Sequence, residues 1–341
     1  MALTSVEKLQ EVFSLAVEDR SAGYADLVAN SNALLSTMKN RGQFKTFSGP
    51  TIRERLLYNE TGSYTRYTGY QYLNPNPAEL FNDAEFVPKL AAVSVTLSGE
   101  DILKNSGANQ LKDVMEEHIS AAETELQDRF TEDLHSSGSL PNQIGGLQLA
   151  IPTVTTAGTY GGISRSNTVW QTTTYDAHTA FTSIIPASPA TSQVSAATIK
   201  AMFDYIMIKH SRGTKGPNLI LSSAEHYTAY TAATVAIQRI NDESTLGKMG
   251  FTALKYYGAG KSVDVVLEGG IGSVMPTNTT YFIDTAALKF RYHPDRNFVK
   301  FGGKQMPINQ DAVVQHIGFF GELTMNNPLH MVKLYDSTPG S

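Results

Sequence analysis

Residues 58–72 read YNETGSYTRYTGYQY, a segment rich in aromatic rings but with no aliphatic residues to form a core of its own. Its five tyrosines are Tyr58, Tyr64, Tyr67, Tyr70 and Tyr72. Threonine, glycine and Arg66 separate them. In extended form a run of this length reaches about 50 Å, at ~3.3 Å per residue. A globule formed from the whole chain has a radius of gyration of only about 20 Å, so we expect an arm that extends beyond the body of the protein.

The arm is predicted to return as an extended β-hairpin over residues 50–97. The chain turns at 74–77, Asn-Pro-Asn-Pro, and residues 93–97, VSVTL, alternate apolar and hydroxyl side chains as a strand does. An isolated two-stranded hairpin is marginal in water, and ordering its backbone costs about 1–2 kcal/mol per residue. Aromatic rings offset this cost only where another surface covers them. We infer that another copy of the chain covers the five tyrosines and Arg66, which are therefore predicted inter-subunit contacts.

The composition favours broad, neutral, hydrogen-bonding surfaces. Of the 341 residues, 41 % are hydrophobic and only 17 % are charged, well below the usual quarter. The net charge is −5 and no basic run occurs, which argues against a dedicated nucleic-acid-binding protein. The chain has no cysteine, so disulfides, thiolate metal sites and cysteine nucleophiles are excluded. We find no secretory signal and no apolar run of about eighteen residues, so no membrane span is expected.

Residues 3–39 are predicted to form an N-terminal helical arm that stops at Gly42. A long helix is expected over residues 109–135, because apolar side chains recur there every three or four positions. The stripe consists of Leu111, Met115, Ile119, Ala122, Leu126, Phe130 and Leu134. We interpret the acidic residues of this helix as its solvated face.

The remainder of the chain reads as an α/β layer with a mixed sheet. Residues 153–174 are predicted to be an ordered loop with short strands, and Trp170 within them a buried structural anchor. Helices are expected near 199–213 and 225–240. Predicted strands are 219–221, 263–267, 280–283, 288–292 and a C-terminal set within 313–334, with a turn at 326–328.

No complete catalytic or cofactor motif is present, so no catalytic residue, cofactor or metal ligand is predicted. Residues 258–262, GAGKS, end like a phosphate-binding loop, but Lys255 stands where its first glycine is required and a strand follows where the motif needs a helix. No Gly-x-Ser-x-Gly elbow occurs, and no two of the eight histidines have helical metal-ligand spacing. We interpret His226 as part of a strand-to-helix junction capped by serine, and His293-Pro294-Asp295 as a turn.

Several fragments, taken in order, resemble the major capsid proteins of tailed bacteriophages, which have the Hong Kong 97-type fold. The first are residues 57–70, Leu73-Asn74, 91–99 (AAVSVTLSG) and 104–107 (KNSG), followed by the long helix. The later ones are residues 161–165 (GGISR) leading to Trp170, 217–222 (PNLILS), 278–283 (NTTYFI) and 318–323 (GFFGEL). The resemblance rests on their order and spacing along most of the chain.

The resemblance implies an α+β fold with five parts. These are an N-terminal helical arm (1–49), an extended hairpin or E-loop (50–97), a peripheral domain with a spine helix (98–142), an α/β axial domain (143–300), and C-terminal strands that return to the peripheral domain (301–341). It also implies a non-enzymatic protein that assembles with copies of itself, as hexamers and pentamers, into an icosahedral shell enclosing double-stranded DNA. The expected location is the virion capsid, assembled in the host cytoplasm.

Further expectations concern covalent links and partners. Some related shells crosslink an E-loop lysine to a neighbouring subunit, but no lysine lies between Lys45 and Lys89, so we predict a non-covalent shell. We expect no long cleavable scaffolding domain before the hairpin, and therefore a separate scaffolding protein, with portal and decoration proteins as further partners. Three alternatives stay open: a tail or tube subunit, an encapsulin-like compartment shell, and a soluble α/β enzyme.

Overall fold

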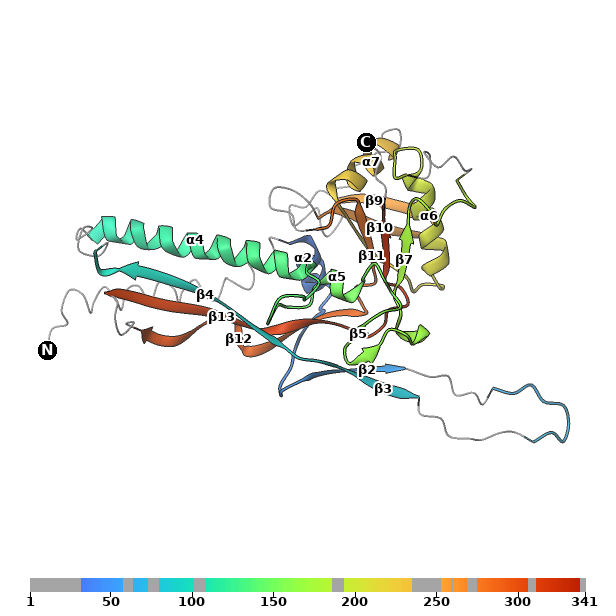
Figure 1. Cartoon of the computed structure of the whole chain (residues 1–341), viewed down its shortest axis with the longest axis horizontal. Coiled ribbons are helices and arrows are strands. Elements are labelled where there is room, and N and C mark those ends of the chain that lie inside the picture. Colours follow the sequence, from blue (N-terminus) through green and yellow to red (C-terminus); the bar gives the residue numbers. More distant parts are fainter. Residues whose placement is uncertain are drawn as a thin grey trace.

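The computed structural model describes residues 32–57, 64–72, 80–100, 108–185, 193–234, 253–258, 260–268, 275–305 and 311–337. Within them the protein has an α+β fold with a four-stranded and a six-stranded sheet. Figure 1 shows the four-stranded sheet and a long helix extending to one side, the six-stranded sheet forming a compact body, and a hairpin projecting on the side away from the start of the long helix.

The four-stranded sheet has the order β1 (Phe44–Thr46), β12 (Leu288–Gln305), β13 (Ala312–Met325) and β4 (Lys89–Ser98). β13 is antiparallel to both of its neighbours, and β1 runs parallel to β12. The alternating segment 93–97 lies in β4 and pairs with β13. The prediction that the hairpin extends to residue 97 was therefore wrong at this boundary. Residues 93–97 belong to the four-stranded sheet.

The long helix α4 (Ala108–His135) packs on this sheet, and its bounds confirm the prediction from the apolar stripe. Five residues of the stripe are buried: Ile119, Ala122, Leu126, Phe130 and Leu134. Leu111 and Met115 lie outside the residues whose side chains are described. The ring of Phe130 meets Phe290, Phe298 and Phe319 edge to face, at centroid distances of 5.7, 5.2 and 5.1 Å.

The six-stranded sheet has the order β7 (Thr173–Asp176), β14 (Val332–Tyr335), β11 (Thr279–Ile283), β8 (Leu219–Ser222), β10 (Lys261–Leu267) and β9 (Ala253–Gly258). Helices α6 (Ile199–His210) and α7 (Ala224–Thr234) share one core with Ile220, Val265 and Phe282 of this sheet. Leu219, Leu221 and Tyr281 belong to a second core. The sheet is thus buried on both faces, which accounts for the continuous apolar run of Leu219, Ile220 and Leu221.

The C-terminal strands do not all pair within the four-stranded sheet. β13 does, since it pairs with β4 and β12, but β14 lies between β7 and β11 in the six-stranded sheet. β12 also crosses the predicted boundary at residue 300. The expectation was wrong for β14 because Val332 and Leu334 are buried in the core beneath α6, and this long-range partner leaves no local sequence signal.

Residues 293–295 are a second correction, because His293-Pro294-Asp295 lies within β12 and not in a turn. The pairing of β12 with β13 shifts between Tyr292↔Gly321 and Asn297↔Phe319. The extra residues are accommodated as an irregularity of the β-bulge type, where a proline is tolerated in a strand.

The predicted stop at Gly42 is confirmed. Helix α2 (Ala33–Asn40) ends where Gly42, at φ 67°, donates its N–H to Lys39 O at 3.0 Å and Gln43 donates to Met38 O at 2.9 Å. This pair of bonds is a Schellman motif, which favours glycine at the left-handed position. Residues 1–31 of the predicted arm lie outside the described residues.

The segment that resembles a phosphate-binding loop joins two antiparallel strands, since Lys261 pairs with Gly258 at the start of β10. Its Lys261 Nζ donates to Lys215 O at 2.7 Å. Within the described ranges, no group of three or more acidic or histidine side chains is placed to hold a metal ion. No helix in that same part of the chain is both long and apolar enough to span a membrane.

Candidate assembly interface

The root of the projecting hairpin is a two-stranded ribbon, β2 (Ile52–Leu57) and β3 (Phe81–Phe86), paired from Ile52↔Phe86 to Leu57↔Phe81. Its two faces differ. On the outer face Arg53 pairs with Glu85 at 2.9 Å and Arg55 with Asp83 at 3.7 Å. These ion pairs are exposed and contribute about 0–1 kcal/mol each, so they favour the strand register more than they stabilise the fold.

The inner face of the root holds a buried ion cluster centred on Glu54. This side chain is 3 % exposed. It accepts hydrogen bonds from Lys289 Nζ and Arg291 Nε, both at 2.6 Å, and from Thr324 Oγ1 at 3.3 Å. The donors belong to β12 and β13, so the cluster connects the root of the hairpin to the four-stranded sheet. A buried charge of this kind is tolerated only because it is paired and hydrogen-bonded.

The Glu54 cluster was not predicted from the sequence, although the sequence contains a signal for it. In Ile52-Arg53-Glu54-Arg55-Leu56 the buried face of the strand carries Ile52 and Leu56, so Glu54 must point to the same face. Lys289 and Arg291 alternate with Leu288 and Phe290 in β12. A carboxylate on a buried face requires a cationic partner, which these residues provide.

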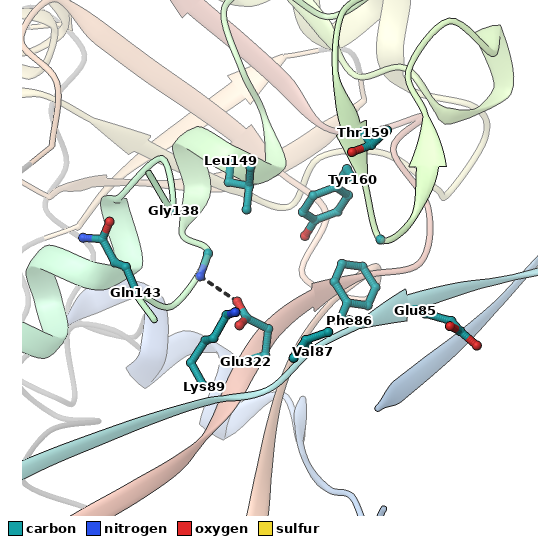
Figure 2. Close-up of a pocket in the computed structure, with 12 residues that line it drawn as sticks. Glu85, Phe86, Val87, Lys89, Gly138, Gln143, Leu149, Thr159, Tyr160 and Glu322 are labelled. Carbon is teal, nitrogen blue, oxygen red and sulfur yellow. Dashed lines mark hydrogen bonds between the residues drawn. The ribbon is translucent and has the colours of Figure 1, made fainter. Parts of the chain in front are cut away.

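A cavity of about 240 Å³ lies where the chain leaves β3 and enters β4 (Figure 2). Glu322 of β13 lines it, is 5 % exposed and accepts a hydrogen bond from Gly145 N at 2.6 Å. Burial raises the pKa of Glu322 to about 8, against the opposing effects of the Gly145 hydrogen bond and the positive charge of Lys89. Figure 2 shows Lys89 and Glu322 pointing toward each other.

On the other wall of this cavity, β3 is hydrogen-bonded to the loop of residues 153–174. Glu85 N donates to Gly161 O at 2.9 Å. Gly161 has φ 57°, and a Cβ there would lie 2.9 Å from Ala84 Cβ and 2.9 Å from Phe86 Cζ. Both the left-handed backbone and the close approach require glycine at this position.

Trp170 lies behind the same wall and is 1 % exposed. Its Nε1 donates to Tyr160 O at 2.9 Å, and its ring stacks on Tyr160 at a centroid distance of 6.0 Å. Tyr160 in turn meets Phe86 at 5.0 Å. The predicted buried tryptophan is therefore found in the core, and a chain of three rings connects it to the hairpin root.

The tip of the hairpin contrasts with its root. Tyr64, Tyr67, Tyr70 and Tyr72 are 82, 61, 106 and 99 % exposed, and Arg66 is exposed. Tyr58 lies outside the described residues. Figure 1 shows this segment extended away from the body. Four exposed rings on one segment form an apolar surface of the kind that marks an interaction site.

His226 lies at the junction of β8 and α7, as expected, and its side chain is buried. Its Nδ1 lies 2.8 Å from Thr280 Oγ1, and burial lowers its pKa to about 4. Ser223 O accepts from Tyr227 N at 2.9 Å, and Ser223 Oγ accepts from Thr279 N at 3.3 Å. Serine thus links the helix start to the neighbouring strand, and the arrangement is that of a structural junction.

No protein-family model and no curated protein matches the sequence. Solved structures do match. The chain is similar to the cyanophage A-1(L) capsid asymmetric unit, with a TM-score of 0.63 and 15 % identity over 90 % of this chain and 93 % of that one. It is also similar to the capsid of the native GTA particle, with a TM-score of 0.54 and 9 % identity over 89 % and 91 % of the two chains.

A structure from Mycobacterium phage Cain gives a TM-score of 0.51 and 12 % identity, over 91 % of each chain. At these identities the likeness concerns the fold, and it extends over almost the whole chain. The protein therefore has the Hong Kong 97-type fold that its sequence resembles.

Proposed function

We propose that this chain is the major capsid protein of a tailed bacteriophage, which assembles into hexamers and pentamers of an icosahedral shell around packaged double-stranded DNA. The observation that carries the proposal is the projecting hairpin, whose root is held by buried charges and whose tip exposes four tyrosines. The fold shared with the cyanophage and GTA particle capsids supports the same function.

The hairpin is the E-loop, and its tip lies on a neighbouring copy. Because the tip of one copy meets a different surface on the next, the contact is heterologous, and such contacts form rings when the rotation closes. The stiff root matters here, because it holds the tip in one direction and reduces the entropy lost on association. α4 is the spine helix of the peripheral part, and the body around the six-stranded sheet is the axial part.

The charge of the chain suits a container wall. A net charge of −5 and a charged fraction of 17 % give little attraction for phosphates, which basic patches bind by displacing counterions. Packaged DNA is thereby enclosed without being held at specific sites. The remaining partners are a portal, a separate scaffolding protein and decoration proteins, and the place of the protein is the virion capsid.

Electron microscopy of the full chain, expressed together with the neighbouring structural genes of its source so that the scaffolding protein is present, tests the proposal. We expect closed icosahedral particles in negative stain. Open tubes, or rings that stack without closing, would contradict a capsid and favour a tail subunit. Closed particles that copurify from their native source with an enzyme inside, and without DNA, would instead identify a compartment shell.

A further inference from the structure

The cavity between the hairpin root and the body is large enough to hold a small molecule. Its volume is about 240 Å³, which exceeds the roughly 150 Å³ of an engineered protein cavity that binds benzene. It is somewhat smaller than the sites of drug-sized ligands, which begin at about 300 Å³. The space therefore suits a compound about as large as one substituted ring.

One wall of this cavity carries a buried hydroxyl group without a hydrogen-bond partner. Tyr160 is 3 % exposed, and its Oη makes no hydrogen bond within the described ranges. Figure 2 shows this hydroxyl directed into the space bordered by Leu149, Phe86 and Glu322. Burial raises the pKa of Tyr160, so the group stays protonated and can donate. Because buried polar groups are normally paired, this hydroxyl marks a place for an acceptor atom of a ligand.

Glu322 supplies a second O–H donor from the facing wall. Its Oε1 accepts from Gly145 N at 2.6 Å. Burial raises the pKa of this carboxyl to about 8, and of its charged neighbours Lys89 of β4 lowers the pKa while Asp133 of α4 raises it. The carboxyl is therefore protonated at neutral pH, and in that form it has one O–H to donate.

The rest of the lining combines one positive charge with apolar side chains. Among the described residues that line the cavity, Lys89 is the only cation. Glu85, at the mouth, is exposed and already paired with Arg53 at 2.9 Å. The apolar members are Phe86, Val87 and Leu149. Two O–H donors and an ammonium group beside apolar side chains complement a carboxylate that carries an apolar tail.

We propose that this cavity is a binding site for a small free monocarboxylate with a short apolar tail. The Tyr160 hydroxyl and the Glu322 carboxyl donate to its oxygens, and Lys89 balances its charge. The tail lies against Phe86 and Leu149. The bound acid connects β3, β13 and the loop of residues 153–174, and so holds the root of the hairpin to the body. The site lies within one chain and does not depend on the proposed assembly.

Benzoate is the probe, added to the unassembled full chain at about pH 6, where the probe is ionised. Sodium chloride at the same concentration is the reference. A ligand that binds only the folded chain raises the unfolding temperature in a saturable manner, and we expect benzoate to do so. Benzylamine, a cation of similar size, should have no effect. Stabilisation by benzylamine and not by benzoate, or by neither, would overturn the proposal.

Tyr160→Phe removes the hydroxyl donor and keeps the ring. Because this hydroxyl has no partner in the free chain, the variant should unfold at a temperature no lower than the wild type. Its dissociation constant for benzoate should rise by about tenfold or more, as expected for a lost hydrogen bond to a charged group. Tyr175→Phe removes a hydroxyl that lies 3.0 Å from His210 Nε2, outside the cavity lining, and should bind benzoate as the wild type does. Equal affinities in the two variants would refute the site.

A pH series on the wild type decides the question if Tyr160→Phe does not fold. Above about pH 8 Glu322 ionises and repels a second carboxylate. The affinity for benzoate should therefore fall about tenfold for each further pH unit, since binding requires one proton. Glu322→Gln keeps a donor that does not titrate, so its affinity should not change over this range. The same pH dependence in both proteins would contradict the assigned contact.

Assembled particles distinguish a free acid from an acidic side chain of a neighbouring copy. We expect particles to bind benzoate as tightly as the unassembled chain does. Loss of binding on assembly would overturn the free acid as the occupant and assign the carboxylate to a neighbouring copy. If no particles form, the proposed function fails, while binding to the unassembled chain still tests the site.

Discussion

Arg291 Nε donates a hydrogen bond of 2.6 Å to Glu54 Oε1 across 237 residues of sequence. This contact joins β2, the first strand of the hairpin, to β12, one of the two inner strands of the four-stranded sheet. It means that the direction of the hairpin depends on a buried charge and not only on the two-stranded ribbon of β2 and β3.

Replacing Glu54 by glutamine should destabilise the protein by about 3 kcal/mol, because it leaves Lys289 and Arg291 without a counter-charge. This is the lower end of the range for breaking a buried ion pair, since these two side chains are 21 and 19 % exposed. Urea unfolding measures the change. Glu85→Gln, which removes an exposed ion pair of the same hairpin, should cost less than about 1 kcal/mol. Equal losses in the two variants would show that the cluster is not structural.

Glu322 should make stability depend on pH in the direction opposite to most carboxylates. Its pKa is raised from 4.5 to about 8 in the folded protein, so the folded state holds a proton that the unfolded state has released between these values. Stability therefore falls as the pH rises from about 4.5 to 8, by up to about 1.4 kcal/mol per pH unit. The loss is complete above pH 8.

Glu322→Gln removes this titration and keeps an oxygen that can accept from Gly145 N. We expect the variant and the wild type to differ least below pH 4.5, and the variant to gain relative stability up to about pH 8. Thermal unfolding at a series of pH values measures the difference. A difference that does not vary with pH would mean that Glu322 is not protonated in the native protein.

Trp170→Ala should cost about 3–5 kcal/mol, the usual range for a large aromatic residue removed from a core. The substitution removes the ring stacked on Tyr160 and the hydrogen bond to Tyr160 O. Val169→Ala is a matched control in the preceding position, because Val169 is 50 % exposed and its loss should change stability by less than about 0.5 kcal/mol. Chemical denaturation distinguishes the two, and a small loss in Trp170→Ala would remove its role as an anchor.

Assembled particles should dissociate fully into single chains in a denaturing gel. The hairpin between Lys45 and Lys89 offers no lysine for an inter-subunit amide bond. A single band near 37.1 kDa is expected from mature particles isolated from their native source. A ladder of higher multiples would show that other residues form covalent links.

The parts of the fold that follow from local pattern could be predicted from the sequence. The apolar stripe of α4 gave its bounds to within one residue, and Gly42 marked a helix end. The buried runs 219–221 and 280–283 are strands of one sheet. In each case the periodicity or the stop residue is contained in a short window.

The predictions were wrong where pairing with a segment distant in the sequence determines the structure. β14 looks like any short strand, and only its pairing with β7 and β11 assigns it to the six-stranded sheet. His293-Pro294-Asp295 has the composition of a turn. In the structure it lies within β12, at an irregularity in the pairing of β12 with β13. The Glu54 cluster needed three strands to be placed together before its charges could be recognised as one site. The exposed tyrosines of the tip were predicted, whereas the surface that receives them remains a proposal.

The most direct test of the central claim compares the wild type with a variant in which Tyr64, Tyr67, Tyr70 and Tyr72 are all serine. We expect the wild type to sediment as closed particles. The variant should remain a monomer at the same concentration, with an unchanged unfolding midpoint, since these rings contact little of their own chain. Particles of equal yield and shape from the variant would contradict the claim that the E-loop tip holds neighbouring copies together.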